Sequence, residues 1–439
     1  MTGDTILALS SPPGTSGLAV VRLSGPACRQ ILLLHLGKAQ PLSRHVYYGA
    51  FRSQAKSVLD RLNFVFFSGP ASSTGEDVLE LYPHGNMLIV DGILKSILEQ
   101  SGVRLAEAGE FTRRSFENGK VDLLQAEAVG ELIHAQTAEA LKNAQRIVGG
   151  ELSGPLKALR ESLLDLSARL ELDVDFSEEE ADPDFSSWIP RIQGVLATLD
   201  KLASGFEKGR SLARSPRVAI LGAPNAGKSS LINALVEEDR LLVSNIPGTT
   251  RDYVDVPLNL PGGMIHLVDT AGLGKPVDGL DELAMERTRS QLEKADFRIW
   301  IEDGVLGGGE VLDANAFSLR IQTKLDLPGF QSKDGFLGLS NRTHVGINAM
   351  RENLNALVFG GGGISGDILL TTERQFRAVD EARNRVKAAL AEMELRKRPA
   401  IEIIAFEIRE ASDQLRELLG EISSDEVLVK IFLGFCIGK

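Results

Sequence analysis

Leucines recur at alternating intervals of four and three between residues 152 and 170. This spacing places them on one stripe of a long helix. Only about three heptads are present, which favours the core of a helical bundle within the chain and leaves a dimer zipper as the alternative. Two later segments have similar apolar faces. The three faces comprise Leu152, Leu156, Leu159, Leu163, Leu166 and Leu170; Phe376, Val379, Val386 and Leu390; and Ile404, Ile408, Ala411, Leu415 and Leu418.

Short apolar runs bounded by Gly and Pro, such as residues 18–23 and 62–67, fill the first part of the chain and predict a small α+β domain. Strand and helix patterns alternate again from 217 to 361, and Gly360–Gly363 with Gly366 mark a flexible boundary. Helices on both sides of this region predict a discontinuous helical domain with an α/β domain inserted into it. The expected fold class is multidomain α+β, with an N-terminal domain at 1–118, helical parts at 119–210 and 371–439, and the insertion at 211–370.

Composition narrows the class of protein. With 439 residues, 43% hydrophobic and 25% charged, the chain predicts several soluble globular domains. It contains neither an 18-residue apolar stretch nor a signal-peptide pattern, so we expect a cytoplasmic protein that is not bound to a membrane. Its two cysteines are far apart, which supports no disulfide framework or zinc site. A net charge of −12 is opposite to that of a typical nucleic-acid binder, so a partner would carry much of any RNA binding.

Residues 222–230 match the phosphate-binding pattern GxxxxGK[ST], between a predicted buried strand at 217–221 and an apolar helix start at 231–235. Glycines let the backbone curve so that its N–H groups face the phosphates, and the helix N-terminus adds positive potential. Lys228 supplies a charge and Ser229 a hydroxyl for magnesium. The predicted nucleotide contacts here are Asn225, Ala226, Gly227, Lys228, Ser229 and Ser230.

A second predicted strand, residues 264–268, ends in Asp269, Thr270, Ala271 and Gly272. An acidic residue at this strand end can hold a magnesium-bound water, and the Gly272 amide can reach a γ-phosphate. Thr250, in the intervening segment 248–252, is the candidate for a second hydroxyl on magnesium. Loss of the γ-phosphate would release both segments, which predicts a nucleotide-dependent switch.

Guanine is normally read by an Asn/Thr-Lys-x-Asp segment, whose carboxylate accepts two hydrogen bonds that adenine cannot donate. The best match is Thr323, Lys324 and Asp326, with Thr in place of the commoner Asn. Ser340, Asn341 and Arg342 stand where Ser-Ala-Lys or Ser-Ala-Arg is usual. The presence of Asp326 favours GTP over ATP.

These nucleotide motifs resemble those of the Era and Der type, and flanking motifs narrow the resemblance to the MnmE (TrmE) family of tRNA-modification GTPases, within the TrmE-Era-EngA-YihA-Septin-like group. The resemblance covers essentially the whole chain. The flanking motifs are Asp4-Thr5-Ile6, Pro12-Pro13-Gly14, Val21-Arg22-Leu23-Ser24-Gly25, the segment 74–81, Gly109-Glu110-Phe111-Thr112, the segment 120–128 and the terminal Phe435-Cys436-Ile437-Gly438-Lys439.

The resemblance implies a folate-binding N-terminal domain that forms a homodimer, and an inserted G domain. It implies a complex, heterotetrameric or larger, with MnmG (GidA), a partner that contains FAD. Together they would install a 5-carboxymethylaminomethyl or aminomethyl group on the wobble uridine, U34, of certain tRNAs. The one-carbon donor would be a reduced folate, either 5-formyltetrahydrofolate or methylenetetrahydrofolate.

The resemblance also implies roles for individual residues. It assigns Arg22, Glu80, Lys120 and Lys439 to the folate site, where cations can meet glutamyl carboxylates and a carboxylate can bind the amino-pyrimidine edge. Cys436 is implied in the modification reaction. Two motifs depart from the family pattern: its Pro-Pro-Gly-Arg-Gly-Gly reads PPGTSG at 12–17, and its Gly-His-Gly-Gly reads PHGN at 83–86.

For hydrolysis, the resemblance implies a potassium ion in place of an arginine finger, which would neutralise charge in the transition state. Its ligands would be Asn225, Ser244, the Ile246 backbone and Thr249. The family's water-orienting glutamate aligns with Asp281, beside Glu282. The loop implied to surround the nucleotide comprises Ser244, Asn245, Ile246, Pro247, Gly248, Thr249 and Thr250.

Two other interpretations remain open. A ribosome-assembly or signalling switch would share the nucleotide motifs, but it would add an RNA-binding domain or a second G domain, and neither is visible in the sequence. A degenerate family member would act structurally and hydrolyse GTP poorly, as Thr323, Asn341, Asp281 and the short Gly307–Gly309 stretch suggest. Comparing GTP hydrolysis in potassium and in sodium distinguishes these interpretations from the potassium mechanism.

Overall fold

The computed structural model describes residues 3–175, 188–212, 215–223, 225–240, 255–269, 295–307, 317–359, 367–395, 400–422 and 425–438. The chain forms two compact units, each assembled from separated segments. The first unit contains Met1–His134, Ala144–Ala203 and Glu373–Lys439, and the second contains Ala135–Asn143 and Ser204–Thr372. The four domain ranges expected from the sequence stay a prediction.

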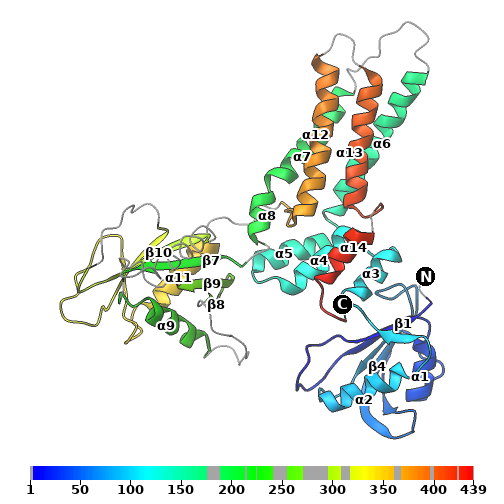
Figure 1. Ribbon diagram of the computed structural model, residues 1–439, viewed down its shortest axis with the longest axis horizontal. Helices are drawn as coiled ribbons and strands as arrows, with labels where there is room; N and C mark the ends of the chain where they lie inside the picture. Colours follow the sequence, from blue (N-terminus) through cyan, green and yellow to red (C-terminus); the bar gives the residue numbers. More distant parts are fainter. Residues whose placement is uncertain are drawn as a thin grey trace, which may run out of the picture. The chain divides into compact units, whose positions relative to one another are not determined.

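A six-stranded sheet forms the N-terminal part of the first unit (Figure 1). Its order is β3-β4-β5-β2-β1-β6, and all neighbours are antiparallel except β1 and β6. β1, which lies between β2 and the edge strand β6, is buried on both faces, because Leu7 packs into the main core with α1 and α2 while Ile6 and Ala8 pack with Phe111 of α3. The elements are β1 Thr5–Leu9, β2 Val21–Ser24, α1 Cys28–Leu36, β3 Val46–Arg52, β4 Val58–Phe67, β5 Val78–Tyr82, α2 Met87–Leu98, β6 Val103–Leu105 and α3 Glu110–Glu117.

The predicted strand at 18–23 begins later, at Val21. Leu18 is 58% exposed, and the amides of Ala19 and Val20 bind the Pro83 carbonyl and the Ser11 hydroxyl. The apolar run therefore starts in a loop, because its first backbone amides are satisfied outside the sheet.

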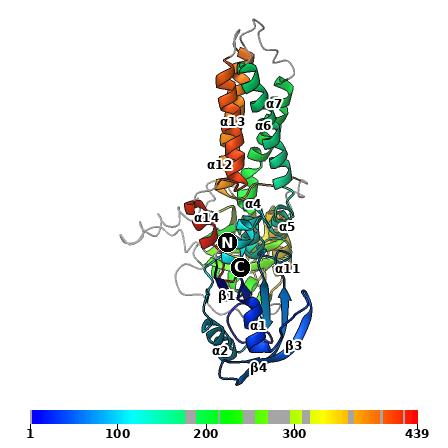
Figure 2. The same ribbon diagram turned by 90° about the vertical axis from the view of Figure 1, so that its right-hand side faces the viewer.

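Helices complete the first unit, and Figures 1 and 2 show α6, α7, α12 and α13 running side by side. Five of the six leucines in the 152–170 stripe are buried, and α6 packs against α13, which confirms an intramolecular core. All five predicted apolar positions of α13 are fully buried. The elements are α4 Leu123–His134, α6 Ser153–Asp175, α7 Ile189–Ser204, α12 Glu373–Leu395, α13 Ile401–Leu418 and α14 Asp425–Leu433. Helix α5, Ala138–Val148, belongs to the second unit up to Asn143 and to the first unit from Ala144. In the described part of the chain, no helix has both the length and the apolar character to cross a bilayer.

The second unit contains a six-stranded sheet of order β12-β11-β10-β7-β9-β8. All pairs are parallel except the β8–β9 hairpin. Its central strand β7 supplies Val218 and Ile220 to a core that α9 and α11 complete with Leu231, Leu235 and Met350. The elements are α8 Phe206–Leu212, β7 Arg217–Gly222, α9 Lys228–Arg240, β8 Asp255–Leu260, β9 Gly263–Asp269, β10 Phe297–Asp303, β11 Leu319–Thr323, β12 Leu337–Gly338 and α11 Ile347–Phe359. The Gly360–Gly363 boundary lies outside the described residues.

Candidate functional site

The phosphate loop, residues 222–230, leaves the carboxyl end of the central strand β7 and enters α9 at Lys228. This is the edge where open parallel α/β sheets bind ligands. Asn225 adopts φ of +63°, a conformation that asparagine tolerates better than most residues. Gly227 has φ of +87°, and Ala226 is buried. The loop thus has the curved backbone that phosphate binding requires.

Three predicted metal- and phosphate-binding positions lie in this loop or beside it. The Lys228 side chain is 7% exposed, and its Nζ donates to the carbonyl oxygens of Gly222 (2.9 Å) and Ala223 (3.0 Å). Ser229 lies in the first turn of α9. Asp269 ends β9, opposite Ile220 of β7, so the two strand ends are adjacent. This arrangement places a cation, a hydroxyl and an acidic position at one sheet edge.

Two base loops, residues 323–326 and 340–342, contact the phosphate loop directly. Thr323 Oγ1 donates to the Ala226 carbonyl (2.8 Å), and Asn341 Nδ2 donates to the Gly227 carbonyl (3.1 Å). The structure therefore brings the predicted guanine-reading segments to the loop predicted to bind phosphates.

Asp326, the predicted guanine reader, accepts a hydrogen bond from Ser340 Oγ at 2.6 Å. This bond lowers the pKa of Asp326, so the side chain stays an ionised acceptor near neutral pH. Lys324 Nζ pairs with the buried Asp303 at the end of β10 (2.5 Å). Burial alone would raise the pKa of Asp303, but hydrogen bonds from Lys324 and from two backbone amides outweigh it and lower the pKa. Both base loops are thus held by charge-assisted bonds.

Several predicted nucleotide, metal and water-orienting positions lie outside the described residues, as does the C-terminal lysine. They are Ser244, Asn245, Ile246, Pro247, Gly248, Thr249, Thr250, Thr270, Ala271, Gly272, Asp281, Glu282 and Lys439.

In the first unit, two of the predicted folate residues form a cross-strand ion pair. The register of β2 and β5 puts Arg22 opposite Glu80, and Arg22 Nε lies 2.9 Å from Glu80 Oε1. Tyr82, two residues along the same strand, donates from its hydroxyl to Glu80 Oε2 (2.5 Å). Burial, followed by the hydrogen bond to Glu80 and its negative charge, raises the pKa of Tyr82 to about 12, so the hydroxyl stays a donor. Both Glu80 oxygens are therefore held in place.

The C-terminal tail, residues 435–438, reaches the same ion pair. Ile437 forms an antiparallel bridge with Ala108. The Gly438 carbonyl accepts from Ser10 Oγ (3.0 Å) and from Arg22 Nη1 (3.5 Å). Gly438 has φ of +94°, and a Cβ there would lie 2.7 Å from a backbone oxygen of β1, so this approach requires glycine. The preceding Cys436 is exposed.

Lys120 makes its observed contacts elsewhere. Its Nζ donates to the Pro70 carbonyl (2.8 Å), and its side chain lies against Gly75. The structure therefore joins Arg22, Glu80 and the tail, whereas Lys120 is held on the 70–75 loop.

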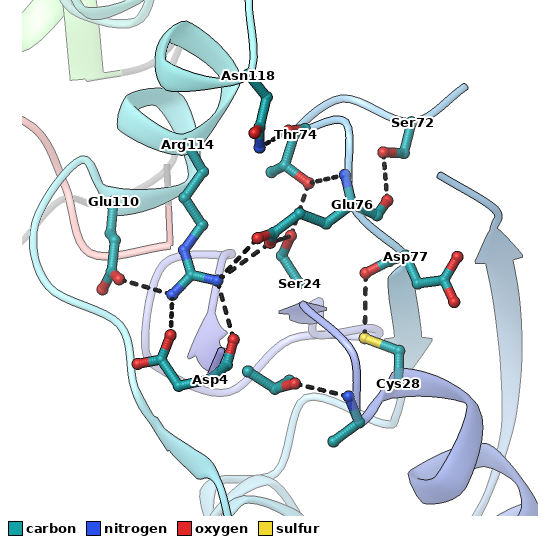
Figure 3. A network of polar contacts seen from close by, with 12 residues as sticks. Asp4, Ser24, Cys28, Ser72, Thr74, Glu76, Asp77, Glu110, Arg114 and Asn118 are labelled. Carbon is teal, nitrogen blue, oxygen red and sulfur yellow. Dashed lines mark hydrogen bonds and ion pairs between the residues drawn. The ribbon is translucent and has the colours of Figure 1, made fainter. Parts of the chain in front are cut away.

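A buried ion network surrounds Arg114 of α3 (Figure 3). Arg114 is 3% exposed, and its guanidinium lies 2.8 Å from Asp4, 3.1 Å from Glu76 and 3.1 Å from Glu110. Arg104 also binds Asp4 and Glu110. Glu76 accepts a further bond from Ser24 Oγ (2.7 Å) on β2. The network thus ties α3 to β2 and to the segment leading into β5.

Sequence reasoning missed Tyr82, Asp303 and Arg114 as supports of these sites. The period of two in a strand could have placed Tyr82 beside Glu80 on one face. No comparable signal marked Arg114, because arginine on a short helix is usually exposed.

A phosphate loop at the carboxyl edge of a parallel sheet, clamped by a segment that carries Asp326, defines a P-loop protein built for guanine nucleotides. Comparisons with known proteins extend this class to the whole chain. The MnmE helical domain model matches residues 123–436, and the GTP-binding protein TrmE N-terminus model matches residues 5–120.

Curated relatives match over nearly their full lengths. The tRNA modification GTPase MnmE of Aeromonas hydrophila subsp. hydrophila is 36% identical over 459 residues, covering 100% of both chains. That of Nitrosococcus oceani is 37% identical over 450 residues, covering 99% of this chain and 97% of the relative. The chain belongs to the MnmE (TrmE) family of tRNA modification GTPases.

Solved structures with likeness to this chain include two FeoB G domains. That of the T. maritima FeoB iron transporter is 23% identical with a TM-score of 0.26, covering 33% of this chain and 99% of that chain. That of Methanococcus jannaschii FeoB is 22% identical with a TM-score of 0.27, covering 33% and 98%.

Proposed function

We propose that this protein is a potassium-stimulated GTP hydrolase of the cytoplasm, acting as a homodimer with MnmG. Its cycle drives 5-carboxymethylaminomethyl or aminomethyl modification of U34 in certain tRNAs, with a reduced folate as one-carbon donor. The observation that carries the proposal is the junction of Arg22, Glu80 and the C-terminal tail. A protein that only switches between nucleotide states does not need a second polar site. Here such a site joins Arg22 to Gly438 of the tail, more than four hundred positions later in the sequence.

The nucleotide chemistry follows from the second unit. We assign phosphate binding to the amides of residues 225–230 and to Lys228, and guanine recognition to Asp326. Ser229 fits a magnesium ligand, because a hydroxyl in the first helical turn after the loop matches the oxygen ligands this ion prefers. Magnesium, when bound, neutralises charge on the phosphates. The roles of Asp281 and Glu282 in orienting water, and of Ser244, Ile246, Thr249 and Thr250 as metal ligands, are part of the proposal.

The folate assignment rests on the chemistry of Arg22 and Glu80. A carboxylate fixed on both oxygens presents its remaining lone pairs in one direction, which suits an amino-pyrimidine edge. A guanidinium suits glutamyl carboxylates. We include Lys120 and Lys439 as further cations, and Cys436, exposed in the tail, as a participant in the modification reaction. The domain ranges 1–118, 119–210, 211–370 and 371–439 belong to the same proposal.

Potassium dependence tests the hydrolytic mechanism. GTP turnover by the full chain is measured in potassium and in sodium at equal ionic strength. We expect turnover at least ~10²-fold faster in potassium, because a potassium ion held by the proposed ligands would neutralise charge that develops in the transition state, as an arginine finger does. Asn225→Ala, which removes a proposed ligand, should abolish the difference. Equal rates in both salts would remove potassium from the mechanism and favour a simple switch.

Replacing Tyr82 with phenylalanine tests the folate site. The change removes the hydroxyl that holds Glu80 Oε2 while leaving the ring in place. Because a hydrogen bond to a charged group contributes about 1.5–3 kcal/mol, we expect 5-formyltetrahydrofolate to bind about tenfold more weakly in calorimetry. Tyr48→Phe, on the 68% exposed Tyr48 of β3, is the matched control and should bind normally. Equal affinity of both variants would contradict the assignment of Glu80.

A further inference from the structure

The two departures from the usual base-reading motifs, Thr323 and Asn341, contact consecutive residues of the phosphate loop. Thr323 is fully buried, and its hydroxyl lies 2.8 Å from the Ala226 carbonyl and 3.3 Å from the Glu302 carbonyl. A hydroxyl carries one proton, so it donates fully to one carbonyl at a time. Thr323 therefore anchors the loop at Ala226 and has no second proton for Gly227.

Asn341 provides the second anchor. Its Nδ2 donates to the Gly227 carbonyl at 3.1 Å. A Cβ built on Gly227 would lie 3.1 Å from Asn341 Nδ2 and 3.5 Å from Thr323 Oγ1, so both side chains pack against this glycine. Alanine, the usual residue at position 341, has no side-chain donor and could not make this bond.

The amide oxygen of Asn341, Oδ1, lowers the stability of the fold in this arrangement. Since Nδ2 faces a carbonyl, Oδ1 must be an acceptor, and among the described residues it is buried without a donor. A buried unsatisfied acceptor destabilises a fold. Stability alone would therefore not favour asparagine at position 341. The effect that can favour it is the hydrogen bond from Nδ2 to the Gly227 carbonyl.

We propose that Asn341 is a positioning residue for the guanine nucleotide, and that it compensates for Thr323. An asparagine at position 323 would be one atom longer and would carry two amide protons, enough to anchor the loop without help. With threonine there, the anchor is divided between two side chains. The inference rests on the nucleotide site proposed above, and it explains two sequence departures by one physical cause.

A double-mutant cycle on the full chain tests the compensation, with binding of fluorescent mant-GDP as the readout. We expect Asn341→Ala to weaken binding about tenfold, chiefly through faster dissociation, in the native and Thr323→Ser backgrounds. In the Thr323→Asn background the same change should cost less than about twofold. An undiminished loss in the Thr323→Asn background would overturn the compensation, as would unchanged affinity in the native background.

Thermal melting of the nucleotide-free chain distinguishes positioning from simple structural support. Asn341→Ala removes an unsatisfied acceptor, so the melting temperature should not fall. Asn353→Ala is the matched control, because Asn353 is exposed on α11 and its Nδ2 donates to the Ala349 carbonyl of the same helix. If Thr323→Asn does not fold, a lower melting temperature for Asn341→Ala with normal affinity overturns the proposal by itself.

Lys228→Ala separates failure of this inference from failure of the site. If Lys228→Ala loses mant-GDP binding while Asn341→Ala retains it, only the anchor role is wrong. If both variants bind normally, the nucleotide site itself is misplaced, and the compensation falls with it.

Discussion

Replacing Lys228 with alanine is expected to lower GTP hydrolysis at least ~10²-fold, because it removes the buried cation to which we assign phosphate binding. The ammonium is held beside the loop by the Gly222 and Ala223 carbonyls, and the side chain is 7% exposed. This low exposure keeps water from screening its charge. Steady-state release of phosphate from GTP, measured across substrate concentrations, checks the prediction.

Two further variants make that result interpretable. Lys142→Ala removes an exposed lysine of the same unit, so it should leave turnover unchanged. Lys228→Arg retains the charge with a different shape and should recover part of the binding but little of the turnover. Normal hydrolysis by Lys228→Ala would place the nucleotide elsewhere in the chain.

Arg114→Met is expected to destabilise the N-terminal sheet by about 3–5 kcal/mol. The substitution leaves Asp4, Glu76 and Glu110 with one cation fewer in a largely buried site. Hydrogen–deuterium exchange of β2 and β5 amides in the full chain measures this local loss. Arg113→Ala is the matched control, because Arg113 forms a surface pair with Glu117 on the same helix and should change stability by less than ~0.5 kcal/mol. Similar exchange in the two variants would refute the structural role of the network.

The same network predicts a pH dependence. Burial alone would raise the pKa values of Asp4 and Glu110, but hydrogen bonds from Arg104 and Arg114 outweigh it, so both values are lowered. Carboxyls with lowered folded-state pKa values add stability above their unfolded values, near ~4, and lose it as pH falls further. The melting temperature should therefore decrease as the pH is lowered below about 4, and Arg114→Met should weaken this pH dependence because it removes one of the cations that lower the two pKa values.

The helical part was predictable because a period of 3.6 residues appears directly in the sequence, as at Leu156 and Leu163. The phosphate loop was predictable because its chemistry tolerates few residue types at each position. The helix against which each of these helices packs was not predictable, because the leucine stripe of α6 specifies an apolar face but not the helix that covers it. Likewise, nothing local in the sequence relates Asn341 to Gly227, because their contact depends on how β12 and β7, the strands that precede them, are ordered in the sheet.

The Arg22–Glu80 pair was predictable only in part. The family resemblance named both residues, but the register of β2 on β5 explains why they meet. The contacts of Tyr82 and Gly438 with this pair required coordinates, because one depends on a side-chain rotamer and the other on a glycine with φ of +94°.

The pairing of α6 with α13 has a consequence for how the protein is made. The ribosome finishes the synthesis of α6, which ends at Asp175, long before it completes α13 at Leu418. At ~5–20 residues per second, this interval lasts roughly 10–50 s. The second unit emerges and can fold during the delay, while the leucine stripe of α6 remains without its partner. We therefore expect newly made chains to be most prone to aggregation at this stage of translation, and slowing synthesis between residues 176 and 400 should lengthen that stage.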